Sequence, residues 1–390
     1  MNRKIKVGDF RGVSLFHSVP SLGSVGLMAL ILFFTLQATP ARVFGSEVPS
    51  EVRAAGDLSI QIYADKVKGA RSMALGEDGT VYVGTRDEGQ VYALRDLDRD
   101  GMADEIKVIA EGLRLPNGVA VLGGDLYVAE NSRIIRIPKA SLEGRGHLDP
   151  VVIYDGFPSK IMHGWKALAA GPDGWLYFSV GVPCNICSPE APYEGRLLRL
   201  QPQTRKLEFL AEGLRNSVGL TFHPVTHELW LTDNGRDYLG DNRPPDELNH
   251  FKVPGSHFGY PFCFGKDQRD PELGQDGGCQ WQTPPEWEFP AHVAPVGLHF
   301  YEGSLLPERF RNQLLVAEHG SWNRSEPQGY RVVMIRFQKG HPVSESVVVD
   351  GWLTSEHKVL GRPVDLLELK DGSLLISDDY ADRIYRLTSK

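Results

Sequence analysis

The sequence predicts an all-β protein, a six-bladed β-propeller with a loop-rich insertion between blades four and five. Three observations lead to this prediction. A tight turn followed by an alternating strand recurs six times, with a spacing near fifty residues. Glycine and proline are abundant, with 42 and 26 copies among 390 residues, as expected for a chain rich in turns. No segment of convincing length has the period of an amphipathic helix.

The repeated unit is a turn with glycine, aspartate or asparagine, followed by a strand of alternating apolar residues. The copies lie at 77–83, 123–128, 172–178, 226–231, 312–316 (the weakest copy) and 370–376. Between their strand positions Val81, Leu126, Leu176, Leu229, Leu314 and Leu374 the steps are 45, 50, 53, 85 and 60 residues. The one long step places the insertion at about 238–295, a stretch rich in proline, glycine and aromatic residues.

Further strands flank most copies of the unit. Apolar strands are predicted before it at 72–75, 118–121, 167–170, 219–222 and 363–366, and after it at 90–94, 133–137, 195–200, 330–335 and 383–387. Antiparallel strands repeating in this way are typical of propeller blades. A β-sandwich with chance similarity between turns is the alternative, but a sandwich does not need six nearly equal units. Loops joining the blades of a propeller gather at one end of its channel, so equivalent blade positions should converge there.

The first 46 residues are expected to form a signal peptide, which leaves 55–390 as the propeller domain. A basic start is followed by an apolar run at 25–36 and by small residues, and cleavage is expected between Ala38 and Ser46. The run is shorter than the roughly 20 residues of a membrane span. A retained anchor is the alternative, and the absence of an Arg-Arg pair argues against a twin-arginine signal. The predicted location is secreted or periplasmic, with no stable membrane span after cleavage.

Charge and cysteine content narrow the function classes. The net charge of -8 argues against a nucleic-acid partner. Four cysteines in an exported chain suggest two disulfides, most simply the local pairs Cys184–Cys187 and Cys263–Cys279. A C-x-x-C pair can also be a redox site or half of a zinc site, but the sequence has no second C-x-x-C. Ser188 follows Cys187 where a c-type haem motif requires histidine.

One acidic loop has the pattern D-x-D-x-D-G-x-x-D. Its carboxylates are Asp96, Asp98, Asp100 and Asp104. Alternating aspartates place oxygen ligands on one side of a loop, and the glycine permits a sharp turn, so we predict a calcium site that rigidifies this loop. Lys107 stands where an EF-hand has its bidentate glutamate. A solvated acidic loop is the alternative.

Polar residues stand where several blades begin. His163 precedes the inner strand of the third blade, Arg215 and Asn216 that of the fourth, and Arg362 that of the last. Histidine is the natural general base near neutral pH, and arginine binds carboxylates and oxyanions. The alternative is that these residues have only structural roles, the histidine in packing and the arginines in salt bridges between blades. The stretch 318–324, also dense in polar side chains, could be only an exposed turn.

These residues together resemble the pyrroloquinoline quinone (PQQ)-dependent sugar dehydrogenases of the glucose/sorbosone dehydrogenase family, and most of all its L-sorbosone dehydrogenase-like branch, which includes pyranose dehydrogenases. The resemblance extends from about Leu58 to Leu387. Its most specific motifs lie at 213–216 (GLRN), 246–249 (DELN), 258–261 (FGYP), 318–324 (EHGSWNR) and 383–386 (RIYR). The family fold is a six-bladed propeller, in agreement with the repeat count.

The resemblance implies roles for the polar residues. His163 matches the general base that takes a proton from the anomeric hydroxyl of the sugar while hydride passes to the quinone. Arg215 and Asn216 match residues that hold PQQ, and Arg362 matches an arginine that binds a PQQ carboxylate. A tricarboxylate quinone requires such guanidinium groups and a Lewis acid at its reactive carbonyl.

The resemblance also implies a calcium ion at the quinone. Gly235 and Arg236 match the two residues whose backbone carbonyls bind that ion. A neighbouring calcium-associated cluster is matched by Asp246, Glu247 and Tyr260.

The chain departs from the soluble glucose dehydrogenases at three places. Met162 replaces an aspartate before the base, and Val364 replaces a second arginine. The family's blade-five lysine aligns near His319 or Gly320, so either His319 or Arg324 is expected to replace it.

The predicted function is therefore oxidation of an aldose or a sorbosone-like sugar aldehyde, with PQQ and Ca²⁺ as cofactors and a cytochrome or quinone as electron acceptor. Two other classes use this fold, which by itself does not choose among them. A metal-dependent lactonase or hydrolase would hold its metal on the propeller axis by carboxylates and asparagines. A non-catalytic propeller would only bind partners. The pair of arginines favours the dehydrogenase, because a lactonase does not need two carboxylate-binding guanidiniums.

Overall fold

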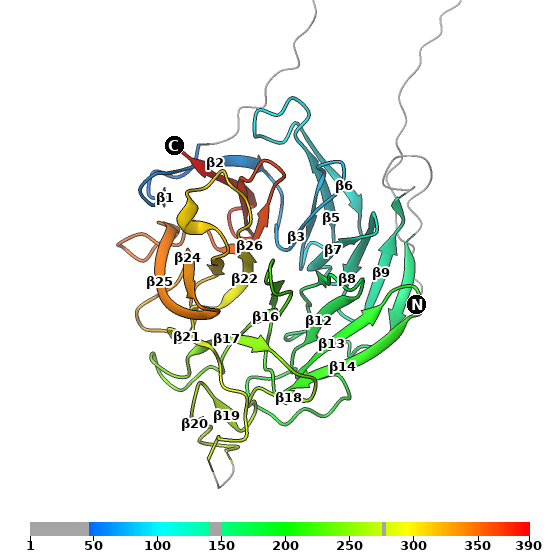
Figure 1. Cartoon of the computed structure of the whole chain (residues 1–390), viewed down its shortest axis with the longest axis vertical. Coiled ribbons are helices and arrows are strands. Elements are labelled where there is room, and N and C mark those ends of the chain that lie inside the picture. The colour runs from blue at the N-terminus through cyan, green and yellow to red at the C-terminus, as the bar shows by residue number, and fades with distance from the viewer. Residues whose placement is uncertain (1–46, 140–149, 275–277) are drawn as a thin grey trace, which may run out of the picture.

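The computed structural model describes residues 47–139, 150–274 and 278–390. Six sheets of four or five strands follow one another around a ring, which confirms the predicted six-bladed β-propeller (Figure 1). The one helical element that lies wholly within the described residues is a 3₁₀ turn, η1 (Glu308–Phe310). No helix in the described part of the chain has the length and apolar character needed to cross a membrane. The predicted signal segment, 1–46, lies outside the described residues.

The first three blades follow the predicted order of strands. Blade one consists of β3 (Met73–Leu75), β4 (Val81–Gly84), β5 (Val91–Arg95) and β6 (Glu105–Ala110). Blade two consists of β7 (Gly118–Leu122), β8 (Asp125–Ala129), β9 (Arg133–Ile137) and β10 (Val151–Asp155). Blade three consists of β11 (Ala169–Ala170), β12 (Leu176–Val180), β13 (Arg196–Gln201), β14 (Lys206–Glu212) and the short parallel β18 (Ser256–His257).

The other three blades complete the ring. Blade four consists of β15 (Gly219–Phe222), β16 (Leu229–Asp233), β17 (Asp246–Phe251) and β21 (Trp287–Phe289). Blade five consists of β22 (Pro295–Phe300), β23 (Leu314–Glu318), β24 (Arg331–Gln338), β25 (His341–Asp350) and β1 (Arg53–Ala54). Blade six consists of β26 (Pro363–Glu368), β27 (Leu374–Asp378), β28 (Arg383–Ser389) and β2 (Leu58–Asp65).

The ring is closed by β2, the second strand of the described chain. β2 is the outermost strand of blade six, where Leu58 pairs with Ser389 and Asp65 with Arg383. The Arg383 guanidinium also donates to the Asp65 carboxylate at 3.0 Å. Because the two ends of the chain share one sheet, the blade cannot be completed until the last strand has formed.

The recurring Asp-Gly turn has one structure in three blades. The aspartate side chain accepts the backbone N–H two residues later, as Asp78 does from Thr80 (3.0 Å) and Asp371 from Ser373 (2.9 Å). The glycines between them have left-handed φ values, +91° at Gly79 and +84° at Gly372. These turns therefore form from local chemistry, which is why the sequence repeat is visible.

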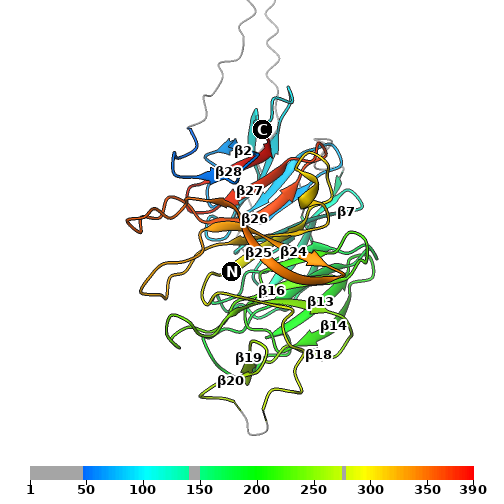
Figure 2. The ribbon, with the colours of Figure 1, turned by 60° about the vertical axis from the view of Figure 1, so that its left-hand side comes forward.

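The insertion differs from its predicted position. The interval 238–295 also contains β17 and β21, which complete blade four, and the irregular part is 252–286. The sequence hides β17 because its first five residues are all buried, so it lacks the alternation of a half-exposed strand. Between β17 and β21, the hairpin of β19 (Cys263–Phe264) and β20 (Gln268–Arg269) lies at one end of the molecule (Figures 1 and 2). The disulfide Cys263–Cys279 closes this segment, and Cys184–Cys187 forms the other predicted pair.

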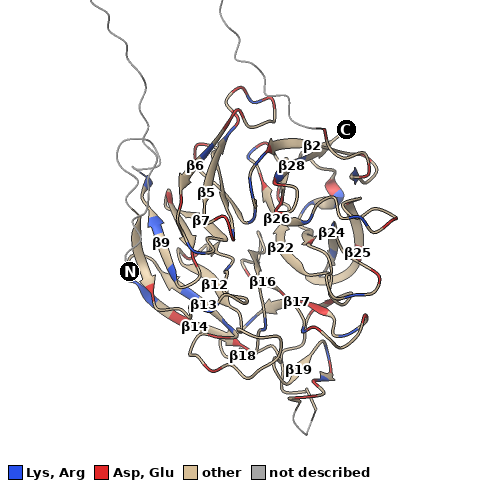
Figure 3. Cartoon of the chain, turned by 180° about the vertical axis from the view of Figure 1, so that it is seen from behind, with Lys and Arg blue, Asp and Glu red and all other residues tan. Residues whose placement is uncertain are grey.

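Charged side chains of both signs share the outer strands. Figure 3 shows Lys and Arg along β9 and β13 beside Asp and Glu on β14. Some of them form cross-strand pairs, as when the Arg199 guanidinium donates to the Glu208 carboxylate at 2.8 Å. Opposite charges directly across from one another in this way stabilise the pairing of neighbouring strands.

Candidate functional site

A cavity of about 260 Å³ opens at one end of the propeller channel. Five of the six blades contribute to its lining, which includes Arg71, Arg86, His163, Trp165, Arg215, Asn216, Asn234, Gly235, Asp237, Asp246, His292, His319, Trp322 and Arg362. Seven of the residues selected from the sequence meet here: His163, Arg215, Asn216, Gly235, Asp246, His319 and Arg362. They are far apart in the chain, and it is the blade geometry that brings them together.

His163 is held as a neutral imidazole. It lies in the turn before β11, with a left-handed φ of 51°. Its Nδ1 lies 2.7 Å from the Val182 carbonyl oxygen, which can only accept, so Nδ1 carries the proton and Nε2 carries the lone pair. Burial, and then the nearby Arg215 cation, lower the pKa of His163 to about 3. The side chain that lines the cavity can therefore accept a proton at Nε2.

Most of the hydrogen-bond donors of the Arg215 side chain are already engaged by protein acceptors. Its Nε and Nη2 donate to the Asn185 backbone carbonyl (2.8 Å) and side-chain oxygen (2.9 Å), and Nη1 donates to the Asn234 carbonyl (3.1 Å). A longer contact of 3.4 Å joins Nη2 to Asp237. Four of the five N–H groups of a guanidinium are thus directed at protein acceptors. Arg215 can offer a ligand its charge and little more than one hydrogen bond.

Asp233 organises the turn that carries Arg215 and Asn216. From the end of β16, its carboxylate accepts the backbone N–H of Arg215 (2.8 Å) and of Asn216 (2.7 Å) and the Ser217 hydroxyl (3.0 Å). Burial raises the pKa of Asp233 to about 6, although these donors oppose the shift. The carboxamide oxygen Oδ1 of Asn216 is buried and has no hydrogen-bond partner in the described chain. It remains available to a donor in the cavity.

Blade six repeats this arrangement for Arg362. The Asp378 carboxylate at the end of β27 accepts the Arg362 backbone N–H at 2.9 Å. The Arg362 side chain donates to two backbone carbonyls, His319 (3.1 Å) and Gly320 (2.5 Å), and its guanidinium carbon lies 5.2 Å from the Tyr330 ring centroid. These partners are uncharged. No ion pair to a carboxylate is found for Arg362 within the described residues, so its full charge faces the cavity.

Arg71, which lines the cavity, and its partner Asp379, which does not, were not selected from the sequence. Asp379 bridges Arg71 and His319, with its Oδ1 2.8 Å from His319 Nε2 and its Oδ2 bonded to Arg71. Burial alone would raise the pKa of Asp379, but the adjacent His319 and Arg71 hold it below its ordinary value. Burial also lowers the pKa of His319. The available signal was the position of Arg71 just before the inner strand of blade one, equivalent to that of Arg362 in blade six.

The structure separates the two candidates for the blade-five position. His319 lines the cavity. Arg324 lies outside the lining, where its guanidinium donates to the backbone carbonyls of Asp241 and, at 3.3 Å, of Ala291. Arg324 therefore ties loops of neighbouring blades to one another and does not line the cavity.

The residues predicted to surround calcium lie beside Arg215. Asp246 Oδ1 accepts the Gly235 backbone N–H at 2.7 Å, and Glu247 accepts the Gly265 N–H at 2.7 Å. The Arg236 side chain is turned away, donating to Asp270 (2.8 Å) and Glu272 (2.5 Å). Burial raises the pKa of Asp246 to about 7 and that of Glu247 to about 8.

Unsatisfied oxygens near this cluster suit a hard cation. The side-chain oxygens of Asn234 and Asn249 are buried without a hydrogen-bond partner in the described part of the chain. A small pocket joins Gly235, Arg236, Glu247 and Tyr260. The Tyr260 hydroxyl accepts the Cys187 backbone N–H at 3.0 Å, so the Cys184–Cys187 loop closes over the same place. Carbonyl, carboxamide and carboxylate oxygens are the ligand types that Ca²⁺ prefers.

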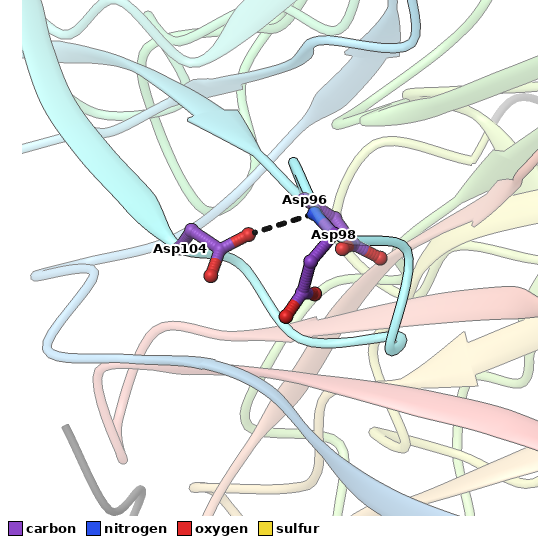
Figure 4. Close-up of side chains that lie close together, drawn as sticks. All are labelled: Asp96, Asp98 and Asp104. Atoms are coloured by element: carbon purple, nitrogen blue, oxygen red, sulfur yellow. Dashed lines mark hydrogen bonds between the residues drawn. The ribbon is translucent and has the colours of Figure 1, made fainter. Parts of the chain in front are cut away.

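The acidic loop is a separate feature between β5 and β6. Asp96, Asp98 and Asp104 offer carboxylate oxygens that lie within 4.8 Å of one another (Figure 4). Asp100 is not part of this group, and its carboxylate accepts the Met102 backbone N–H at 2.9 Å. The three side chains are absent from the cavity lining, so a cation here would act on the loop and not on the channel.

The chain is similar in sequence to one protein family and to individual known proteins. The TrAA12-like family model matches residues 52–390. An uncharacterised protein of Borreliella burgdorferi is 30% identical over 359 residues, which cover 88% of this chain and 93% of that protein. A PQQ-dependent pyranose dehydrogenase of Coprinopsis cinerea is 28% identical over 158 residues, 32% of this chain and 21% of that protein.

A solved structure confirms the fold. The calcium structure of the Trichoderma reesei carbohydrate-active enzyme of family AA12 superposes with a TM-score of 0.75 at 19% identity, over 87% of this chain and 97% of that one.

Proposed function

The chain belongs to the TrAA12-like family, and from that membership we propose that it is a PQQ- and calcium-dependent dehydrogenase. Its substrate would be an aldose or a sugar aldehyde, and its electrons would pass to a cytochrome or a quinone. Two disulfides suit an oxidising compartment, so we place the protein in the periplasm or outside the cell. One observation carries the proposal: a neutral histidine and an arginine without a carboxylate partner face the same cavity.

The cavity suits an anionic, planar cofactor. Arg71 and Arg215 are buried in its wall, but each has a carboxylate within reach, whereas Arg362 has only carbonyl partners. We therefore assign Arg362 the main role in binding a carboxylate of PQQ, with His319 beside it. Arg215 would contribute its positive charge and one hydrogen bond. The Asn216 side-chain oxygen would accept a hydrogen bond from the ligand. PQQ, when bound, accepts the two electrons of the substrate, and calcium polarises its reactive carbonyl.

Calcium would lie beside Gly235 and Arg236. We propose that their backbone carbonyls bind the ion, with Asp246, Glu247 and Tyr260 supporting the loops around it. A second calcium at Asp96, Asp98 and Asp104 would stiffen the β5–β6 loop.

His163 would remove the proton from the anomeric hydroxyl. Its Nδ1–H bond to the Val182 carbonyl fixes the ring, and its neutral Nε2 needs no prior deprotonation. A base with a pKa of about 3 is weak, but Arg215 contributes to that low value. An anionic ligand next to Arg215 would offset this contribution and so raise the pKa of His163, while burial, the larger cause, would continue to lower it.

A propeller hydrolase is less well supported by the geometry. Such an enzyme would gather carboxylates around a metal on the axis. Across the described residues, the one group of three carboxylates close enough to share a cation is that of Asp96, Asp98 and Asp104, which does not line the channel cavity.

The test is an absorbance titration of the purified protein with PQQ, in calcium and in a chelator. We expect saturable binding in calcium, followed by dye reduction with aldoses or sorbosone. Arg362→Gln should weaken PQQ binding about tenfold or more, as loss of a charge-assisted hydrogen bond predicts. Arg336→Gln, in which an exposed arginine of β24 is replaced, is the matched control. Absence of PQQ binding by the wild-type protein in calcium would refute the proposal.

A further inference from the structure

Two exposed aromatic side chains meet at the mouth of the cavity. Trp322 follows β23 in blade five and lines the cavity, with 65% of its surface exposed. Tyr238 follows β16 in blade four and is 69% exposed. Their rings are edge to face, with centroids 6.0 Å apart and an interplanar angle of 88°. Large apolar surfaces left open to solvent beside a cavity commonly mark a contact site.

The loops that carry these rings are tied together. The Asp241 carboxylate accepts the Ser325 backbone N–H at 3.0 Å, and Arg324 donates to the Asp241 carbonyl. His292 Nε2 lies 2.9 Å from the Gly240 carbonyl oxygen, which anchors the same loop from the other side. Within the blade-five loop, Ser321 and Gln328 exchange two hydrogen bonds of 2.9 Å. The loops that carry the rings are therefore fixed to one another before any ligand arrives, which lowers the entropy cost of binding.

We propose that Trp322 and Tyr238 form a subsite that stacks a second sugar ring, so that the enzyme accepts the reducing end of a disaccharide or longer oligosaccharide. The inference rests on the proposed sugar dehydrogenase function. The reacting ring must approach Nε2 of His163 inside the cavity. The proposed cofactor and the reacting ring would both occupy this cavity, so a further ring would lie at its mouth, where Trp322 is part of the lining.

The arrangement of the Trp322 and Tyr238 rings suits a pyranose. One face of a pyranose ring presents C–H groups, which pack against an aromatic face, while its edge hydroxyls remain in water. Two rings at nearly a right angle offer one face for stacking and one wall for the edge of the sugar. Deeper in the cavity, Trp165 is covered by Arg86, whose guanidinium carbon lies 5.1 Å from the ring centroid. Of these three aromatic residues, Trp322 and Tyr238 thus have the more open surfaces.

The experiment compares glucose with maltose and cellobiose. Dye reduction gives KM and kcat for wild type, Trp322→Ala, Trp322→Phe and Tyr238→Ala. Trp281→Ala is the control, because that tryptophan is also exposed (51%) but does not line the cavity. Tryptophan fluorescence of the cofactor-free protein, titrated with the same sugars, reports binding without turnover.

We expect Trp322→Ala to raise KM for at least one disaccharide about tenfold, equivalent to about 1.4 kcal/mol. The effect on KM for glucose should be at least fivefold smaller, and Trp322→Phe should restore most of the loss. Equal effects on glucose and both disaccharides, or no effect on either, would overturn the subsite. A disaccharide-dependent fluorescence change lost in Trp322→Phe would support the subsite even if PQQ activity were absent, so the two proposals fail separately.

Discussion

Replacing His163 by asparagine tests the proposed base with little change to the backbone. The φ of 51° at this position is left-handed, a conformation that asparagine tolerates well. The Asn Nδ2 group takes the place of the histidine Nδ1 and can keep the hydrogen bond to the Val182 carbonyl, which is 2.7 Å long in the wild type. Only the second ring nitrogen, which would accept the proton, is lost.

The expected magnitude follows from the role of that nitrogen. General-base catalysis contributes roughly 10²–10⁴-fold, so kcat should fall by about 100-fold or more, equivalent to about 3 kcal/mol. Cofactor affinity should change by less than about threefold, since no cofactor contact is assigned to Nε2. His227→Asn is the matched control, because His227 also has a positive φ, 58°, but is exposed and outside the cavity lining.

The assay is dye reduction at saturating sugar, alongside an absorbance titration with PQQ. Turnover of His163→Asn within tenfold of wild type would refute the assignment of the base, and a fall explained by lost PQQ binding would refute the separation of roles. The same variant identifies the His163 ring signals in an NMR spectrum. In the cofactor-free protein these signals should not titrate between pH 8 and 5, because the pKa of His163 is about 3. A midpoint near 6.5 would contradict that environment.

Three further changes test the residues and the strand that support the site. Asp379→Asn should lower the unfolding free energy in urea by about 3 kcal/mol or more, because buried Arg71 loses its carboxylate partner; a loss below about 1 kcal/mol would contradict this. Burial raises the pKa of Asp378 to about 6, so the stability from this group is complete below pH 4 and is lost as pH rises through 6. Asp378→Asn should therefore reduce the loss of stability between pH 5 and 8 by about 1 kcal/mol. An unchanged pH dependence would show that Asp378 does not contribute to this loss. A chain starting at Lys66 lacks β2 (Leu58–Asp65) and should melt well below one starting at Gly56, since both lack β1; equal melting temperatures would mean that β2 does not close the ring.

Much of the fold could be predicted because its signals are local. The Asp-Gly turns at Asp78 and Asp371 satisfy their own backbone through hydrogen bonds two residues away, so each blade marks itself in the sequence. The pairing of β2 with β28 left no such mark, since Leu58 and Ser389 are partners across almost the whole chain. Strand β17 was assigned to an insertion because both of its faces are buried, which removes the alternation that identifies a strand.

The site was predicted less completely than the fold. His163, Arg215 and Arg362 were found from their place before the inner strands, and the cavity does bring them together. Arg215 and Arg362 have equivalent positions in the sequence of their blades, yet most donors of Arg215 are engaged by protein atoms, whereas Arg362 keeps a charge without a carboxylate partner. Asp379 gave no signal, because its importance comes from two partners, Arg71 and His319, in other blades.

The sequence by itself determined the number of blades, because turn chemistry and strand alternation are set by near neighbours. The family and the types of residue at the channel mouth came from the resemblance of its motifs, such as 213–216 and 318–324, to known dehydrogenases. Only the tertiary structure decided which of those residues face one cavity and which hydrogen bonds are already made there. It also placed Trp322 and Tyr238 edge to face from neighbouring blades. The physical reason is that hydrogen-bond saturation, burial and pKa depend on groups brought close by ring closure, and no local pattern encodes those distances.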